Sequence, residues 1–199
     1  GLMAANVLSE ANLDKDEILK LAIELEGHPD NVAPAIYGNM IIAFMEDGNL
    51  YHESIKVPEE IRFLAMVPDF ELSTEKARAV LPKEIPHKHG VFNVSRCALL
   101  IAAFTKNNLD LVKAACKDKF HQDYRSHLIN NYDDIVAYAN SLDSLGTFLS
   151  GAGPTIMTLA KDGDDEILDK MKSYLAALPD NWQILDLHCD PNGAYYKEV

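Results

Sequence analysis

The sequence predicts an α+β protein, and three observations support that class. Strand-like runs flank the turn Glu46-Asp-Gly-Asn49, a pattern typical of a β-hairpin. The helices and strands do not alternate in regular βα units, so a doubly wound parallel sheet is not expected. Several segments carry apolar residues at helical spacing, the first of them at Ile18, Leu21, Ala22 and Leu25.

The first predicted helix covers residues 14–26. Asp14 suits the N-cap and Glu17 the N3 position, because together they can form a capping box. Gly27 follows as the stop, since glycine adopts the left-handed conformation that ends many helices. Pro29 suits the first turn of a second short helix, where its missing N–H costs nothing.

Residues 39–45 and 50–57 are the predicted strands of the hairpin. Pro58-Glu-Glu60 interrupts the apolar pattern and is the best candidate for a domain boundary. The elements predicted beyond it are a strand at 61–67, helices at 73–81, 91–105, 109–116 and 133–142, strands at 147–149 and 155–159, a helix at 167–175, and strands at 182–188 and 194–197.

Composition limits the class of partner. The 199 residues carry a formal net charge of −13, which argues against nucleic acid as a partner, and no membrane-spanning run or signal peptide is visible. Cys97, Cys116 and Cys189 lack metal-type spacing, so we expect reduced thiols in a cytoplasmic protein. Residues 1–8 read as the middle of an apolar helix without an N-cap, so we expect the chain to begin inside an element.

The densest polar segment is Glu24-Leu-Glu-Gly-His-Pro-Asp-Asn31, at a helix end and the following loop. Glu24, His28, Asp30 and Asn31 can converge there, and a carboxylate can hold Mg²⁺ through oxygen. The alternative is an ordinary polar turn in which Asp30 or Asn31 caps the next helix. Zinc is less expected, since no second His or Cys stands at ligand spacing.

Three further segments are candidates. Ser150-Gly-Ala-Gly-Pro-Thr155 allows a close backbone approach, although for this segment alone a tight hairpin without function is the better explanation. Arg78 and Arg125 suit carboxylate recognition, but a surface salt bridge is the usual role of a single arginine. His87-Lys-His89 looks like a metal motif, but we expect it to lie in a solvated loop.

Together these segments resemble the homoserine kinases of the GHMP kinase superfamily. The matching pieces are Glu24 with His28-Pro-Asp-Asn-Val-Ala-Pro-Ala-Ile-Tyr-Gly38, then Thr74-Glu-Lys-Ala-Arg-Ala-Val-Leu-Pro-Lys-Glu-Ile85, and Leu149-Ser-Gly-Ala-Gly-Pro-Thr-Ile156. The resemblance implies the end of a ribosomal-S5-domain-2-like ATP-binding domain at 1–58, followed by a ferredoxin-like domain at 59–199. It also implies ATP- and Mg²⁺-dependent phosphorylation of the side-chain hydroxyl of L-homoserine, a step toward threonine, and a homodimer.

The resemblance also implies residue roles. Glu24 matches the Mg²⁺ ligand, and Asn31 matches a group near the substrate and the transferred phosphoryl. We assign no general base: Asp30 is the only candidate in the motif, and it could equally serve the helix N-terminus. His28, Arg78 and Arg125 match substrate-binding residues of the family. The motif that lies beside the phosphate loop is matched by Ser150, Gly151, Gly153 and Thr155.

One family motif does not occur in the 199 residues, namely the phosphate loop of the form P-x-x-x-G-L-G-S-S-A-A. We therefore expect a C-terminal piece of the enzyme with an incomplete ATP site, for which the missing N-terminal segment would be a partner. Two other hypotheses stay open: a related kinase acting on mevalonate or shikimate, and a non-catalytic remnant that binds a small molecule.

Overall fold

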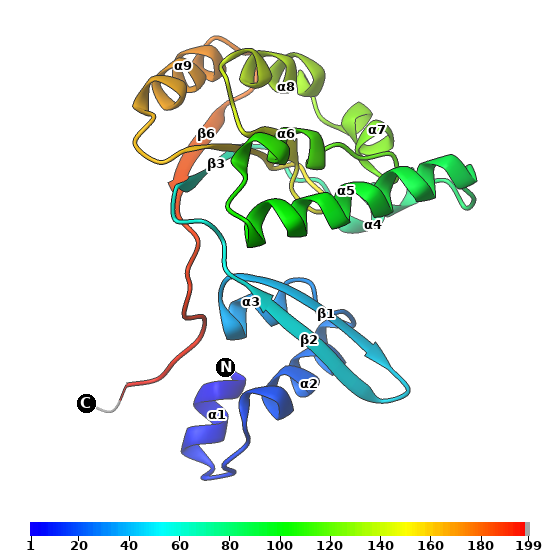
Figure 1. Cartoon of the computed structure of the whole chain (residues 1–199), viewed down its shortest axis with the longest axis vertical. Coiled ribbons are helices and arrows are strands. Elements are labelled where there is room, and N and C mark those ends of the chain that lie inside the picture. The colour runs from blue at the N-terminus through cyan, green and yellow to red at the C-terminus, as the bar shows by residue number, and fades with distance from the viewer. Residues whose placement is uncertain (198–199) are drawn as a thin grey trace. The chain divides into compact units, whose positions relative to one another are not determined.

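The computed structural model describes residues 1–197, which form two compact units (Figure 1). The first unit contains Gly1–Val57 together with the C-terminal segment from Cys189, and the second contains Pro58–His188. The first has a two-stranded sheet and the second a four-stranded sheet, and all the strand pairs are antiparallel. Both units combine helices with antiparallel strands, so the α+β prediction is confirmed.

The first unit begins with the helices α1 (Leu2–Leu8), α2 (Lys15–Glu26) and α3 (Val32–Tyr37). The ends of α2 are as predicted, with an Asp14–Glu17 capping box and Gly27 at φ 90°. The predicted start of the second helix at Pro29 is wrong, because residues 28–31 form a turn and α3 begins only at Val32.

The hairpin consists of β1 (Met40–Glu46) and β2 (Asn49–Ile55), paired from Met40↔Ile55 to Glu46↔Asn49. Its side chains Ile41, Ala43 and Leu50 pack against the core formed by Ile18, Leu19, Ala22, Ile23, Ala33 and Ile36 of α2 and α3. The hairpin also exposes Phe44 and Tyr51, whose rings stack 5.1 Å apart.

The C-terminal segment contains no strand between Ala194 and Lys197, so that prediction is wrong. Instead, the Ala194 amide donates to the carbonyls of Ala35 and Ile36, at 2.9 and 3.2 Å. These carbonyls lie at the end of α3, where a helix leaves acceptors unsatisfied. The segment is therefore held by the end of a helix rather than by a neighbouring strand.

The second unit contains β3 (Ile61–Pro68), β4 (Gly146–Leu149), β5 (Ile156–Lys161) and β6 (Trp182–Leu187). Their order in the sheet is β4-β5-β3-β6, as a ferredoxin-like domain requires. The helices α8 (Tyr132–Ser141) and α9 (Asp165–Ala176) lie side by side (Figure 1) and contribute to one core with the sheet. The rings of Tyr138 and Tyr174 stack between these helices, 4.1 Å apart.

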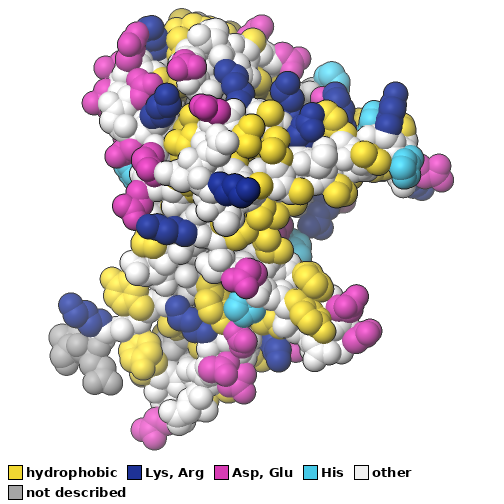
Figure 2. All heavy atoms as spheres, viewed as in Figure 1, with side chains coloured by type: hydrophobic (Ala, Val, Ile, Leu, Met, Phe, Trp, Pro, Cys, Tyr) yellow, Lys and Arg dark blue, Asp and Glu magenta, His cyan; other side chains and the backbone are white. Residues whose placement is uncertain are grey.

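The remaining helices of the second unit include α5 (His87–Thr105), which follows Pro86 directly. The predicted solvated loop at His87-Lys-His89 is therefore wrong, because these residues form the first turn of α5. Apolar side chains are exposed along α5 (Figure 2), among them Val91 and Val94 at 57% and 69%. The other helices are α4 (Thr74–Ala79), η1 (Leu109–Leu111), α6 (Val112–Ala115), α7 (Gln122–Arg125) and η2 (Ser126–Leu128).

Candidate active site

The predicted polar segment of the first unit runs from the last turn of α2 to the start of α3. Glu24, Asp30 and Asn31 are exposed, while His28 is half-buried. The His28 Nδ1 atom contacts the Asp30 carboxylate. The structure therefore brings His28 and Asp30 together and leaves three polar side chains accessible to a ligand.

The carboxylate of Glu24 forms no ion pair or hydrogen bond within residues 1–197. In the same residues, no group of three or more His, Cys, Asp or Glu could hold a metal ion by itself. One exposed carboxylate fits Mg²⁺, which keeps several waters and binds through one or two carboxylates plus substrate phosphates. It does not fit zinc, which needs three or four protein ligands.

In the second unit, Arg125 lies on α7 and its guanidinium is bound by main-chain carbonyls. Its Nε donates to the Ala77 carbonyl at 2.9 Å, and its Nη1 donates to the Gly151 carbonyl at 3.0 Å. The Nδ1 atom of His121 lies 3.3 Å from the same Nη1. No carboxylate pairs with Arg125 in the described part of the chain, so the usual surface salt bridge is not its role.

Arg78 is exposed on α4, directly after the residue whose carbonyl binds Arg125. Burial lowers the pKa of Arg125, the positive charge of Arg78 lowers it further, and the negative charge of Asp118 opposes both effects. An arginine remains charged in spite of such shifts. Two guanidinium charges therefore act on each other in this region, and together they favour an anion such as a carboxylate.

The glycine loop, residues 150–155, joins β4 to β5 as a tight turn. The Ser150 amide donates to the Thr155 carbonyl and the Gly153 amide to the Ser150 carbonyl, both at 2.9 Å. Gly151 and Gly153 have φ values of 56° and 82°, in the region that favours glycine. The loop is thus a hairpin turn, and its Gly151 carbonyl also accepts a hydrogen bond from Arg125.

Three residues that hold α7 were not singled out from the sequence: Asn93, Asp118 and Gln122. Asp118 accepts hydrogen bonds from the backbone at the start of α7, and Asn93 and Gln122 connect that region to α5 and β4. An acid shortly before a helix start is a capping signal. However, α7 has only four residues, too few for the apolar periodicity that reveals a helix.

Two family models match the chain. The model described as "GHMP kinases N terminal domain" matches residues 1–39, and the one described as "GHMP kinases C terminal" matches residues 100–177. The chain belongs to the GHMP kinase family, which confirms the predicted resemblance.

Within that family, homoserine kinases are among its relatives. The homoserine kinase of Clostridium botulinum (strain ATCC 19397 / Type A) is 48% identical over 193 residues. That comparison covers 97% of this chain and 65% of the relative. The chain thus spans somewhat less than two thirds of the length of the curated protein.

Solved structures also include a homoserine kinase among the proteins that this chain resembles. The crystal structure of homoserine kinase from Cytophaga hutchinsonii matches with a TM-score of 0.88 and 27% identity, over 95% of this chain and 62% of that one. The L. major mevalonate kinase matches with a TM-score of 0.68 and 20% identity, over 96% and 63% of the two chains. At that identity, the second match shows a shared fold alone.

Proposed function

We propose that the protein containing this chain transfers the γ-phosphoryl group of ATP to the side-chain hydroxyl of L-homoserine. The products are O-phospho-L-homoserine and ADP. One O–P bond forms at the substrate hydroxyl, the bond from phosphorus to the ADP oxygen breaks, and the hydroxyl proton leaves. Two observations support this proposal. The chain is 48% identical to a homoserine kinase over 97% of its length, and the second unit contains the neighbouring positive charges of Arg78 and Arg125.

The observation that carries the proposal is the positive charge of Arg125. Its charge has no carboxylate partner within residues 1–197, and a second arginine charge acts on it. A free amino acid presents a carboxylate that can accept charge-assisted hydrogen bonds from the guanidinium N–H groups that the main-chain carbonyls do not occupy. We assign the substrate carboxylate to Arg125 and Arg78, with Ser150, Gly151, Gly153 and Thr155 as the loop that supports Arg125.

In the first unit we assign the Mg²⁺ of Mg-ATP to Glu24. When bound, this ion offsets the negative charge of the β- and γ-phosphates. We assign His28 to the substrate and Asn31 to the transferred phosphoryl group. Asp30 is the only acid in the motif that could accept the hydroxyl proton, and the His28 contact orients it.

Turnover of a substrate panel by the full gene product tests the proposal. We expect ADP release with L-homoserine and Mg-ATP, and ³¹P NMR should identify a phosphate monoester on the side-chain oxygen. Mevalonate and shikimate serve as the competing acceptors. Turnover of mevalonate equal to that of homoserine would overturn the choice of substrate, and an absence of turnover with all three would favour a non-catalytic role.

Location and assembly remain predictions. None of the helices in residues 1–197 is long and apolar enough to cross a membrane. We expect a cytoplasmic homodimer that binds neither membranes nor nucleic acid, as the composition and the resemblance predict. Sedimentation of the purified gene product would measure the assembly directly.

A further inference from the structure

The loop before α7 contains a carboxylate that accepts four hydrogen bonds. The side chain of Asp118 is only 8% exposed. Its donors are the Asn93 Nδ2 and the Phe120 amide on Oδ1, at 2.6 and 2.9 Å, and the His121 and Gln122 amides on Oδ2, both at 2.7 Å.

These bonds keep the carboxylate charged. Burial by itself raises the pKa of Asp118, but the hydrogen bonds outweigh burial and lower it below its usual range. Hydrogen bonds to an ionised group are roughly twice as strong as those between neutral groups. Asp118 is therefore a strong attachment point for the first residues of α7 and, through Asn93, for α5.

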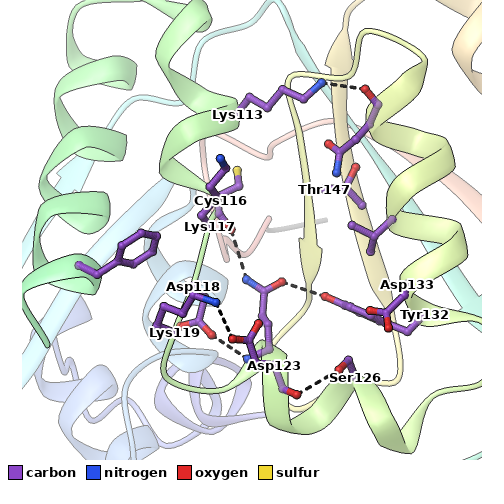
Figure 3. Close-up of a pocket in the computed structure, with 14 residues that line it drawn as sticks. Lys113, Cys116, Lys117, Asp118, Lys119, Asp123, Ser126, Tyr132, Asp133 and Thr147 are labelled. Carbon is purple, nitrogen blue, oxygen red and sulfur yellow. Dashed lines mark hydrogen bonds and ion pairs between the residues drawn. The ribbon is translucent and has the colours of Figure 1, made fainter. Parts of the chain in front are cut away.

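The helix α7 needs such an attachment because it has only four residues. One turn of helix is unstable by itself, since nucleation fixes several backbone angles for a single hydrogen bond. On one side of this region lies a cavity of about 500 Å³, lined by Asp118, Lys119, Tyr132 and Thr147 among others (Figure 3). Side chains leave a hollow on this side of the loop, so the hydrogen bonds to Asp118 contribute to holding the loop in place.

The ends of α7 carry two links to the glycine loop and its strand. At one end, the Gln122 Oε1 accepts a hydrogen bond from the Leu149 amide at 3.0 Å. At the other end, the Arg125 Nη1 donates to the Gly151 carbonyl. A shift of α7 would therefore move the guanidinium relative to the loop and to the Ala77 carbonyl.

We infer that Asp118 is a positioning residue for the carboxylate-binding site, acting through α7 to hold the Arg125 guanidinium in place. The inference rests on the proposed function for the identity of the carboxylate, which is that of L-homoserine. Asp118 does not touch the substrate in this scheme. Its effect is on where the guanidinium lies before the substrate arrives.

The test compares Asp118→Asn with Asp123→Asn in the full gene product. An asparagine at 118 keeps one acceptor oxygen but turns an NH₂ group toward one pair of donors. Asp123 lies on α7 as well, is 56% exposed and pairs with Lys119, so its substitution is a matched control. The substrates are L-homoserine and 3-amino-1-propanol, which is homoserine without its carboxylate.

We expect Asp118→Asn to raise KM for L-homoserine about tenfold, as loss of a charged hydrogen bond does, with kcat changed less than about threefold. The values for 3-amino-1-propanol and the KM for ATP should stay unchanged, and Asp123→Asn should behave as wild type. Equal losses with both acceptors, or no loss at all, would overturn the inference. If Asp118→Asn does not fold, Asn93→Ala removes one donor and should give the same pattern with a smaller change.

A second measurement does not depend on the reaction. Amide exchange by NMR should show faster exchange at Leu149 and at residues 120–122 in Asp118→Asn, with β3 and β5 unchanged. If wild type does not phosphorylate homoserine, the proposed function fails, and this exchange pattern alone decides whether Asp118 holds α7. Uniformly faster exchange throughout the second unit would mean a general loss of stability and would overturn the positioning role.

Discussion

In the second unit two main-chain carbonyls bind Arg125, whereas in the first unit the exposed carboxylate of Glu24 has no protein partner within residues 1–197. The guanidinium is thus fixed before any ligand binds, which reduces the conformational entropy lost on binding. A carboxylate that binds a hydrated metal ion gains less from such fixing, because waters and phosphates complete the coordination. Under the proposed assignments, a prearranged group would recognise the substrate charge and an adaptable one would bind the metal.

The two units also differ in what holds them together. The first has a small core of α2, α3 and one hairpin face, to which the C-terminal segment adds backbone hydrogen bonds. The second has a sheet with two covering helices and a buried Arg62 that pairs with the exposed carboxylates of Asp165 and Asp186. We therefore expect the first unit to be most sensitive at one backbone contact and the second to be sensitive at these ion pairs.

Gly193→Ala should have the largest effect on stability. Gly193 has φ 64°, and a Cβ added there would lie 2.5 Å from both the Gly38 amide nitrogen and the Ile36 carbonyl oxygen. Backbone atoms cannot move aside as a flexible side chain can. We expect a loss of about 3 kcal/mol in the free energy of unfolding of the first unit, measured by urea titration.

Gly48→Ala is the matched control for this prediction. Gly48 has a similar φ of 77°, but nothing lies within 4 Å of its added Cβ. The cost should be only that of the left-handed conformation, about 1 kcal/mol. Equal losses at the two glycines would show that the C-terminal contact contributes nothing beyond backbone conformation.

Asp30→Asn tests the first unit's role in chemistry. If Asp30 accepts the hydroxyl proton, kcat for L-homoserine should fall about a hundredfold, which is typical of a lost general base. The melting temperature should hardly change, because the side chain is 71% exposed. Steady-state turnover of the full gene product measures the effect.

Asp47→Asn, on the exposed hairpin turn of the same unit, is the control and should retain wild-type kcat. Near-normal turnover of Asp30→Asn would remove Asp30 from the general-base role. Its contact with His28 would then be explained as part of an ordinary polar turn.

Much of the fold could be predicted because its signals are local. The Asp14–Glu17 capping box and the glycine stop defined α2, and the turn at 46–49 defined the hairpin. The final segment at 194–197 could not be predicted, because its partner is the end of α3, far away in the sequence. An apolar pattern alone does not distinguish a strand from a segment held by distant carbonyls.

Some residues of the candidate site could likewise be predicted from the sequence, and others could not. Motif residues such as His28 and Arg125 could be named from the sequence, because their neighbours carry a specific pattern. Asp118 could not, since its importance depends on donors from α5 and from the start of a four-residue helix. Long-range hydrogen bonds leave no periodic signal, and a buried acid resembles any surface acid in the sequence.

Arg62→Met, in the second unit, should lower the free energy of unfolding by less than Gly193→Ala does. Arg62 is 4% exposed and donates to Asp186 through two nitrogens and to Asp165 at 2.9 Å. Methionine fills part of the volume, and both acids can reach water, so the loss should be about 2 kcal/mol rather than that of a fully buried pair. Lys170→Met, which breaks the exposed pair with Glu166, should cause no measurable change in urea unfolding.

The pH dependence of the stability lost in Arg62→Met shows whether the ion pairs or the packing of Arg62 cause it. The hydrogen bond from Arg62 is the main reason that the pKa of Asp186 lies below its usual range. A lowered folded-state pKa gives stability that is present above the unfolded value, about 3.9, and is lost as the pH falls through the folded value. The difference in unfolding free energy between wild type and Arg62→Met should therefore be constant from pH 5 to 7, by the same linkage, and shrink below about pH 4. A difference that persists unchanged at pH 2 would mean that Arg62 stabilises the second unit by packing alone, and the two units would then differ less than their structures suggest.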